Sequence, residues 1–355
     1  MAIVDVTVMG GGIFGLAIAW DCVRRGARVS LYERDRIGAG SSGGIVGALA
    51  PHVPEQWNPK KAFQLESLLM AEGFWREVAE VSGIDPGYAR LGRVQPLADT
   101  AAVALARGRA DGAAALWQGR AEWRVVPARD DGWAPESPSG WLIQDTLSAR
   151  LHPRQAATAL VAAIRAKDGV VTEAASGPPA GVFENRRNGT VVWATGVAGL
   201  TELSGDLGRT VGVGVKGQAA LFRCDARDQP QLFVEGLHIV PHGDGTVAVG
   251  STSERSYDAV DTTDTQLDAL IDRARTACSA LRDAPVIERW AGLRPRAKSR
   301  TPMLGEWPGR PGHFVANGGF KIGFGMAPKV AQVMADLVLD GCDVIPDGFR
   351  VGDSL

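Results

Sequence analysis

The stretch IVDVTVMGGGIFG, residues 3–15, decides the fold of this chain. Residues 3–8 are mostly apolar and β-branched, which is typical of a buried strand. Gly10, Gly12 and Gly15 then follow with the spacing GxGxxG. In a dinucleotide-binding turn the first glycine permits a sharp bend, the second lets the backbone approach a pyrophosphate, and the third lets a helix pack closely on the strand. The pattern therefore favours a nucleotide site over a merely structural turn.

The residues after this turn complete a strand-helix-strand unit. Residues 13–25 predict a helix that ends at Gly26, and residues 27–33 predict a second strand. Glu33 lies at the end of that strand, where a carboxylate accepts hydrogen bonds from ribose hydroxyls and repels a 2'-phosphate. This order of elements is the first half of a dinucleotide-binding fold.

Length and composition restrict the class of protein. The chain has 355 residues, of which 45% are hydrophobic, and this length favours two domains. The formal net charge of -2, with basic residues spread along the chain, excludes a footprint for nucleic acid. No stretch reaches the roughly 18 apolar residues of a membrane span, and no signal peptide is expected. Four widely spaced cysteines favour free thiols, so we predict a cytoplasmic protein with small-molecule partners.

The residue pattern changes several times along the rest of the chain. Helical patterns cover residues 60–81, 153–167, 264–281 and 327–340, and residues 191–196 predict a strand that enters a glycine loop. Residues 212–253 alternate apolar and polar side chains around a turn at 243–245, as an antiparallel sheet does. Residues 99–115 are rich in alanine but weakly patterned, and residues 127–138 are loop-like. A tryptophan-rich region from residue 57 to 141 indicates a second domain or a cap.

Several ordered motifs together resemble a known family. The N-terminal loop continues as YERDRIGAGSSGGIVGALAPH, and HPR, WATG, IVPHGDGTVAVGSTSE, AGLRP and GGFKIGFGMAP follow at residues 152–154, 193–196, 239–254, 291–295 and 318–328. In this order they resemble the FAD-dependent D-amino-acid oxidase family, with glycine oxidase as its most similar branch. The resemblance spans nearly the whole chain, and residues 54–140 match it poorly.

The resemblance implies an α/β fold with two domains. A Rossmann-like FAD-binding domain of the GR2 type would be assembled from residues 1–53, 141–205 and 291–355. A substrate-binding domain built on an antiparallel sheet would take residues 54–140 and 206–290. The active site would lie between them.

The same resemblance implies a non-covalent FAD, because no cysteine lies near Arg294 and a link through His52 is not expected. The turn, Glu33 and Arg34 would hold the ADP half, and the later loops would line the pyrophosphate and the isoalloxazine. The cofactor-binding residues implied in this way are Gly10, Gly12, Ile13, Phe14, Gly15, Glu33, Arg34, Ser41, Ser42, Gly43, Ala194, Thr195, Gly196, Gly318, Gly319, Phe320, Lys321, Ile322 and Gly323.

Three further residues are candidates for the substrate pocket. Arg294 falls where glycine oxidase keeps its substrate-carboxylate arginine, and a planar guanidinium can grip a carboxylate through two hydrogen bonds. The alternatives for Arg294 are a surface arginine or a structural ion pair. Lys321, which replaces an arginine, would stabilise the reduced flavin, assist oxygen activation or bind substrate, and otherwise is a solvated loop lysine. His238, which replaces a tyrosine, is either a pocket residue or a hydrogen-bonded histidine of the sheet.

No metal site is expected. His238 and His242 have a spacing that resembles a metal pair, but Pro241 lies between them and no third ligand is near in the sequence. His242 is expected at the hairpin turn.

The function predicted from these residues is oxidation of a small amino acid or secondary amine acid, of the D-amino acid, glycine or N-methyl glycine type. Hydride transfer to flavin N5 would give an imine that hydrolyses to a keto acid, and O2 or another acceptor would reoxidise FAD. One alternative is an FAD-dependent 2-hydroxy-acid or D-amino-acid dehydrogenase that uses an electron carrier. An NAD-dependent dehydrogenase and a non-catalytic flavin-binding protein remain further alternatives.

Overall fold

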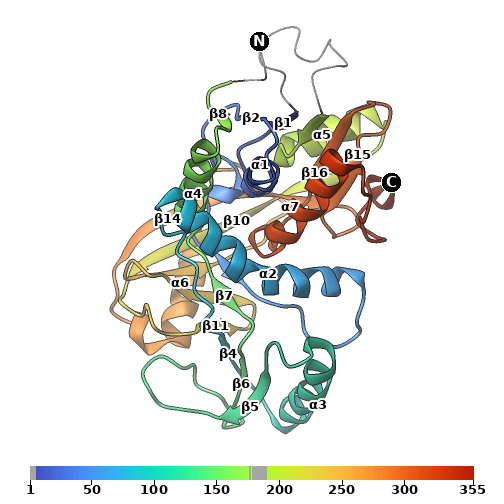
Figure 1. Ribbon diagram of the computed structural model, residues 1–355. Helices are drawn as coiled ribbons and strands as arrows, with labels where there is room; N and C mark the ends of the chain where they lie inside the picture. Colours follow the sequence, from blue (N-terminus) through green and yellow to red (C-terminus); the bar gives the residue numbers. More distant parts are fainter. Residues whose placement is uncertain (1–4, 176, 178–189) are drawn as a thin grey trace.

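The computed structural model describes residues 5–175, 177 and 190–355, and shows two large sheets joined by helices (Figure 1). One sheet lies in the upper part of the view with β1, β2 and β8, and the other extends downward to β4, β5 and β6 (Figure 1). Ile3 and Val4 of the predicted first strand lie outside the described residues. The strand is observed from Val6 to Met9.

Among the described residues, the first sheet has six strands, and all neighbouring pairs are parallel except β15 with β16. The β1 strand lies between β2 and β9, so the turn after β1 emerges where the ends of these parallel strands meet. In sheet order the strands are β15 (Met303–Glu306), β16 (His313–Asn317), β9 (Thr190–Trp193), β1 (Val6–Met9), β2 (Val29–Tyr32) and β8 (Val170–Thr172).

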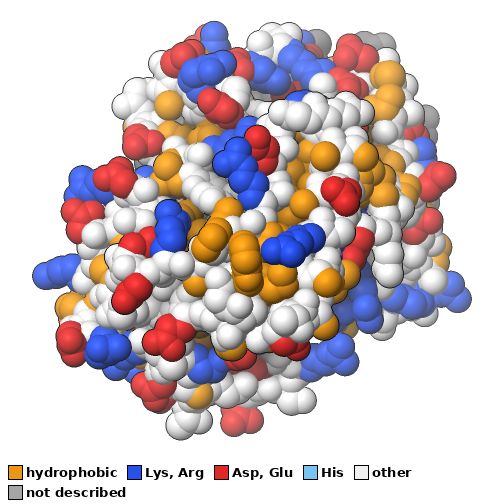
Figure 2. Space-filling model, turned by 90° about the horizontal axis from the view of Figure 1, so that it is seen from below, with side chains coloured by type: hydrophobic (Ala, Val, Ile, Leu, Met, Phe, Trp, Pro, Cys, Tyr) orange, Lys and Arg blue, Asp and Glu red, His pale blue; other side chains and the backbone are white. Residues whose placement is uncertain are grey.

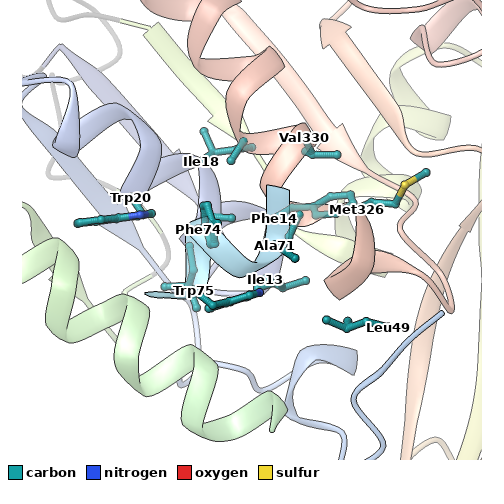
Figure 3. Packing of buried hydrophobic residues seen from close by; sticks show 14 of the residues in the cluster. Ile13, Phe14, Ile18, Trp20, Leu49, Ala71, Phe74, Trp75, Met326 and Val330 are labelled. Carbon is teal, nitrogen blue, oxygen red and sulfur yellow. The ribbon is translucent and has the colours of Figure 1, made fainter. Parts of the chain in front are cut away.

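The helix that follows the glycine turn is buried on nearly every side. Every residue of this helix except Arg24 is buried, as expected for a helix that is apolar all round. Its Phe14 and Ile18 lie beside Met326 and Val330 of the last helix, and Trp75 packs nearby (Figure 3). The helices that contact one another in this core are α1 (Ile13–Arg24), α2 (Pro59–Ser82), α4 (Pro153–Ala166) and α7 (Gly323–Asp340).

The second sheet has eight strands among the described residues and is antiparallel except where β11 runs parallel to β4. In sheet order these strands are β14 (Val286–Ala297), β10 (Gly212–Arg223), β13 (Thr246–Gly250), β12 (Leu237–Pro241), β11 (Gln231–Val234), β4 (Arg93–Pro96), β6 (Trp141–Asp145) and β5 (Trp123–Pro127). The remaining elements are β3 (Ala48–Leu49), β7 (Ala149–Arg150), α3 (Thr100–Trp117), α5 (Gly196–Asp206), α6 (Thr265–Ala277) and the short 3-10 helices η1 (Ser41–Gly43), η2 (Ser279–Leu281) and η3 (Val351–Ser354).

The mixed α/β fold with a parallel and an antiparallel sheet is confirmed. The hairpin at residues 243–245 is also confirmed, because β12 and β13 pair on either side of it. The division into two domains stays a prediction. In the structure β14 runs through the predicted boundary at residue 291 and joins the eight-stranded sheet along its whole length.

One helix was not predicted, and two differ from their predicted extents. Residues 100–117 form α3, since alanine is the best helix former and the Asp99 side chain caps the first turn by accepting a hydrogen bond from the Ala102 amide. The last helix begins at Gly323 rather than Ala327, with Pro328 inside it. The α6 helix ends at Ala277, and η2 continues the chain.

Acidic and basic side chains are interspersed over the face of the molecule seen in Figure 2, with hydrophobic side chains between them. Within the described part of the chain, no helix is both long and apolar enough to cross a membrane.

Candidate active site

The turn after β1 has a backbone that only glycine adopts easily. Gly10 has a φ of +107°, and a Cβ atom there would lie 2.5 Å from the carbonyl oxygen of Ala194. A Cβ atom at Gly15 would lie 2.0 Å from the carbonyl oxygen of Gly10. The turn therefore passes closely between β9 and the first turn of α1, as the GxGxxG spacing predicts.

The start of α1 is open toward the turn. Gly12 is the N-cap residue and supplies no side-chain cap, while Ser42 Oγ accepts a hydrogen bond of 2.9 Å from the Ile13 amide. A helix N-terminus of this kind attracts anions, because its free amide N–H groups and the positive end of the helix dipole both lie there.

Glu33 follows β2 directly and reaches over the turn. Its Oε2 accepts a hydrogen bond of 2.7 Å from the Gly11 amide, and its Oε1 accepts one of 2.9 Å from the Asp35 amide. Arg34, by contrast, is exposed and pairs with Asp35 at 3.1 Å. The carboxylate of Glu33 is thus held in place beside the turn, and the remaining lone pairs of its oxygens can accept hydrogen bonds from a ligand.

A single cavity of about 970 Å³ connects this turn with the eight-stranded sheet. This volume is near the upper end of the range for ligand sites, which suits a dinucleotide with a second ligand. The structure brings nearly all predicted cofactor and pocket residues to the wall of this cavity, and Gly15 and Gly43 are the two that do not line it. Instead, Gly15 packs against the turn, and the Gly43 carbonyl accepts a hydrogen bond of 3.0 Å from Arg154 Nε.

Arg294 projects from β14 and is buried, with 7% of its surface exposed. Its Nη1 donates a hydrogen bond of 2.5 Å to Ser251 Oγ, and its Nη2 donates to the Thr252 and Lys216 carbonyls at 2.7 and 3.2 Å. Its Nε is buried and has no hydrogen-bond partner among the described residues.

Arg294 forms no ion pair with a carboxylate within the described part of the chain, although Glu254 lies near enough to act on its charge. Burial lowers the pKa of Arg294 to about 10, and the nearby charge of Glu254 partly opposes this effect. At neutral pH the guanidinium is therefore charged and desolvated. An anionic ligand that enters the cavity would gain a charge-assisted hydrogen bond from it.

Lys321 and Phe320 lie on the segment between β16 and α7. The Nζ of Lys321 is 5.9 Å from the ring centroid of Phe320, and the Cζ of Arg294 is 5.4 Å from the same centroid. Burial lowers the pKa of Lys321, and the charges of Arg294 and Arg296 lower it further. Both Lys321 and Phe320 line the cavity, and Lys321 is exposed to solvent there, so its position agrees with the pocket alternative and with that of a solvated loop lysine.

His238 lies on β12 and faces the same cavity. Its ring packs on Phe233, with centroids 4.7 Å apart, and its Nδ1 has no hydrogen-bond partner among the described residues. Burial lowers the pKa of His238 to about 3, and the charges of Arg93 and Lys321 contribute to this shift. His238 is therefore neutral at physiological pH and offers an unused ring nitrogen to a ligand.

Some residues of the cavity wall were not predicted from the sequence. Ser251 holds Arg294, and Phe233 and Trp290 supply apolar surface. Ser251 and Trp290 could have been found, because Ser251 lies within the GSTSE motif and Trp290 directly precedes AGLRP. Nothing in the local sequence marks Phe233.

Comparison with known proteins agrees with this geometry. The family model for FAD dependent oxidoreductases, DAO, matches residues 5–337. The chain is 28% identical to glycine oxidase of Pseudomonas putida over 98% of this chain and 99% of the relative. It is 27% identical to glycine oxidase of Geobacillus kaustophilus over 94% of this chain and 92% of the relative. The chain belongs to the DAO family of FAD-dependent oxidoreductases.

The fold of this FAD-dependent oxidoreductase is also that of a solved relative. The crystal structure of glycine oxidase from Geobacillus kaustophilus superposes with a TM-score of 0.79, at 21% identity, and covers 98% of both chains. The architecture expected from the motifs is thereby confirmed.

The residues around the cavity fit FAD, the cofactor of this family. The glycine turn and the start of α1, where Gly12 supplies no side-chain cap, suit a pyrophosphate, and Glu33 suits a ribose. In addition, Thr195 Oγ1 is buried in the cavity wall without a hydrogen-bond partner among the described residues. A buried hydroxyl of this kind is costly unless a ligand satisfies it.

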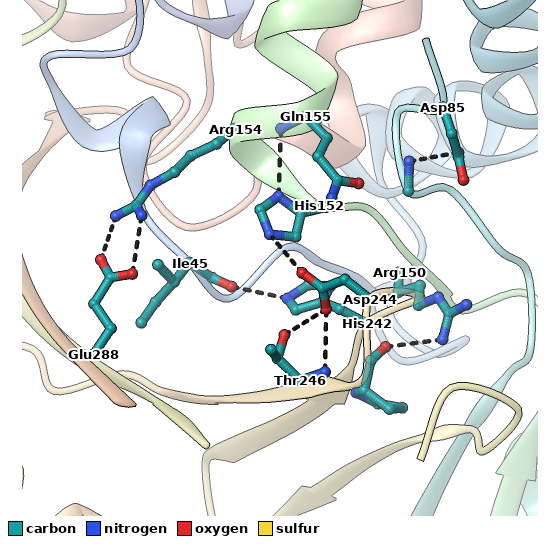
Figure 4. Close-up of polar contacts among 12 residues, drawn as sticks. Ile45, Asp85, Arg150, His152, Arg154, Gln155, His242, Asp244, Thr246 and Glu288 are labelled. Atoms are coloured by element: carbon teal, nitrogen blue, oxygen red, sulfur yellow. Dashed lines mark hydrogen bonds and ion pairs between the residues drawn. The ribbon is translucent and has the colours of Figure 1, made fainter. Parts of the chain in front are cut away.

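The other two histidines named from the sequence, His242 and His52, do not line the cavity. His242 is at the end of β12, as expected, and its Nε2 contacts the Ile45 carbonyl at 2.9 Å (Figure 4). His52 binds Gln64 through its amide at 2.8 Å and does not line the cavity. In the described part of the chain, no group of three potential ligands is arranged to hold a metal ion.

Proposed function

We propose that this enzyme oxidises a small amino acid or secondary amine acid whose carboxylate binds Arg294. The observation that carries the proposal is the buried guanidinium of Arg294, which faces the cofactor cavity and lacks a carboxylate partner among the described residues. A guanidinium grips a carboxylate through parallel hydrogen bonds and so fixes the position of the α-carbon.

The side chains around Arg294 then supply orientation and exclusion of water. Ser251 and the backbone carbonyls hold the guanidinium from behind, and its Nε remains available as a donor. Phe233 and Trp290 provide apolar wall, and the neutral ring of His238 can accept or donate a hydrogen bond. No acid or base is required if the substrate binds as its free amine.

FAD, when bound, accepts the hydride that leaves the α-carbon of the substrate. Loss of this hydride and of a proton from nitrogen converts the amine to an imine. Water hydrolyses the imine to a keto acid and ammonia. When the nitrogen carries a substituent, the products are a keto acid and a primary amine. O2 or another acceptor would then take up the two electrons.

A 2-hydroxy acid is the second candidate substrate, since Arg294 recognises the carboxylate and not the amine. An FAD-dependent dehydrogenase that delivers electrons to a carrier would use the same residues. The two candidates differ in the substrate that reduces the flavin and in the acceptor that reoxidises it.

The test is an anaerobic screen of flavin reduction with amino acids, N-methyl amino acids and 2-hydroxy acids, followed by reoxidation with O2 or a dye. We expect an amine acid to bleach the flavin, and an Arg294→Gln variant to lose about tenfold to a hundredfold in substrate affinity. The matched control is Arg282→Gln, since Arg282 is exposed and remote from the cavity. If no amine or hydroxy acid reduces the flavin, the proposal is wrong.

A further inference from the structure

Three cations surround the ring of Phe320 at the cavity. The Cζ atoms of Arg294 and Arg296 are each 5.4 Å from the ring centroid, and the Nζ of Lys321 is 5.9 Å from it. Lys321 and Arg294 both line the cavity, and the distance between their charged groups cannot exceed the sum of their distances to the ring. The two charged groups therefore lie at most about 11 Å apart on the cavity wall, which a ligand with a carboxylate at each end could span.

These three charges are not balanced by acidic side chains. In the described part of the chain, no carboxylate forms an ion pair with Arg294, Arg296 or Lys321. The cation-π contacts with one ring offset only part of the cost of holding three cations together. Among the described residues, four carboxylates line the cavity: the Glu33 side chain bonds the glycine turn, Asp35 and Glu202 pair with arginines outside this group, and Asp261 is exposed and forms no ion pair with the three cations.

A ligand with one carboxylate would compensate only Arg294. Lys321 is exposed in the cavity wall and would then remain without a carboxylate partner, while partial burial of its ammonium group and the two arginines lower its pKa. A second carboxylate on the ligand would remove this imbalance, because an ammonium group binds a carboxylate through a charge-assisted hydrogen bond.

We propose that Lys321 forms a second anion subsite and that the preferred substrate is a short dicarboxylic amino or imino acid. The α-carboxylate binds Arg294, and the other carboxylate binds Lys321. This inference rests on the proposed function and narrows its substrate class.

The first experiment uses the wild-type holoenzyme and matched substrates. Aspartate, asparagine and alanine, in both enantiomers, and iminodiacetate and sarcosine are compared in anaerobic flavin reduction. We expect aspartate or iminodiacetate to have a dissociation constant about tenfold or more below that of its neutral counterpart. Equal affinity for aspartate and asparagine, together with equal affinity for iminodiacetate and sarcosine, overturns the inference.

The second experiment changes Lys321 itself. Lys321→Met should weaken the dicarboxylate by about tenfold to a hundredfold more than it weakens alanine or sarcosine, while Lys321→Arg should keep the preference. Lys298→Met is the control, since Lys298 is exposed and its Nζ contacts only the Leu355 carbonyl at 3.1 Å among the described residues. An equal loss for both substrate types in Lys321→Met contradicts the subsite.

A binding measurement separates this inference from the proposed function. Succinate and butyrate have the same number of carbon atoms, and their binding can be followed by the change they cause in flavin absorbance. We expect succinate to bind more tightly than butyrate, and the difference to vanish in Lys321→Met. If no substrate reduces the flavin, the proposed function fails, and the succinate measurement still decides whether the subsite exists.

Discussion

Lys216 and Glu254 form a buried ion pair, with 3.7 Å between Nζ and Oε2, on the two backbone segments that hold Arg294. The Lys216 carbonyl accepts a hydrogen bond from Arg294, and the Thr252 carbonyl accepts another. Gln218 Nε2 donates to Glu254 Oε1 at 3.0 Å and thereby ties the pair to β10. The charges of Lys216 and Glu254 balance each other, so the charge of Arg294 remains available to an anionic ligand.

Breaking this pair should destabilise the protein. Glu254→Gln leaves the buried Lys216 with Asp264, at 3.8 Å, as its one acidic partner among the described residues, so we expect the free energy of unfolding to fall by about 3 kcal/mol. Urea unfolding of the holoenzyme measures the change. The control is Asp268→Asn, which breaks an exposed pair with Arg289 at 2.7 Å and should cost less than about 1 kcal/mol. Equal effects of both substitutions would show that burial of the Lys216–Glu254 pair is unimportant.

Gly10 should be intolerant of any side chain. In Gly10→Ala the new Cβ would meet the Ala194 carbonyl oxygen at 2.5 Å, and the φ of +107° is unfavourable for alanine. We expect the affinity for FAD to fall by about tenfold or more, because the turn must move away from the pyrophosphate. Fluorescence titration of the apoprotein with FAD measures the affinity.

Gly26→Ala is the matched control for this substitution. Gly26 also has a positive φ, of +90°, but a Cβ atom there would contact nothing within 4 Å. The Gly26→Ala substitution should lower the free energy of unfolding by about 1 kcal/mol and leave FAD affinity unchanged. Loss of FAD affinity in Gly26→Ala, or its retention in Gly10→Ala, would contradict the role of the turn.

His242 should make the protein sensitive to acid. Burial lowers the pKa of His242 from 6.5 to about 4, so the folded protein holds it neutral. Between these pH values only the unfolded chain takes up the proton, so this contribution to stability is complete above pH 6.5 and declines as the pH falls toward about 4. The loss from this one group is about 3 kcal/mol.

His242→Gln tests this contribution. Glutamine can still donate to the Ile45 carbonyl, which His242 Nε2 contacts at 2.9 Å, but it does not titrate. Urea unfolding between pH 7 and pH 4 should show a shallower decline in the variant than in the parent. His238, whose pKa is also lowered, remains in both proteins and cancels in the comparison. His152 lies 4.9 Å from His242 between ring centroids, so its titration is coupled to that of His242 and is part of the measured difference. Identical pH dependence of the free energy of unfolding in the two proteins would exclude His242 as the cause of the acid sensitivity.

Features that depend on short-range spacing could be predicted from the chain alone. The strand, the glycine turn, α1 and Glu33 are close in the sequence, and each follows from local backbone geometry and hydrophobic periodicity. The motif around Arg294 was found through resemblance to a family. Its position on the cavity wall agrees with that reading, although its role in binding substrate stays a proposal.

Local patterns predicted the middle of the chain poorly. The β4, β5 and β6 strands are short and pair with one another or with β11, which is far away in the sequence, so their stability comes from these partners and not from their own periodicity. Helix α3 was missed because its alanine content hides any apolar stripe.

The sequence of this protein thus determines the class of its cofactor by itself. A dinucleotide is bound by a backbone turn, and a short spacing of glycines encodes that turn. The charge balance around the substrate follows from the folded chain. Lys216, Ser251, Arg294 and Lys321 come from separate strands and loops, and only their packing shows which charges are paired. Whether a buried cation is structural or available to a ligand depends on long-range contacts, which no local pattern records.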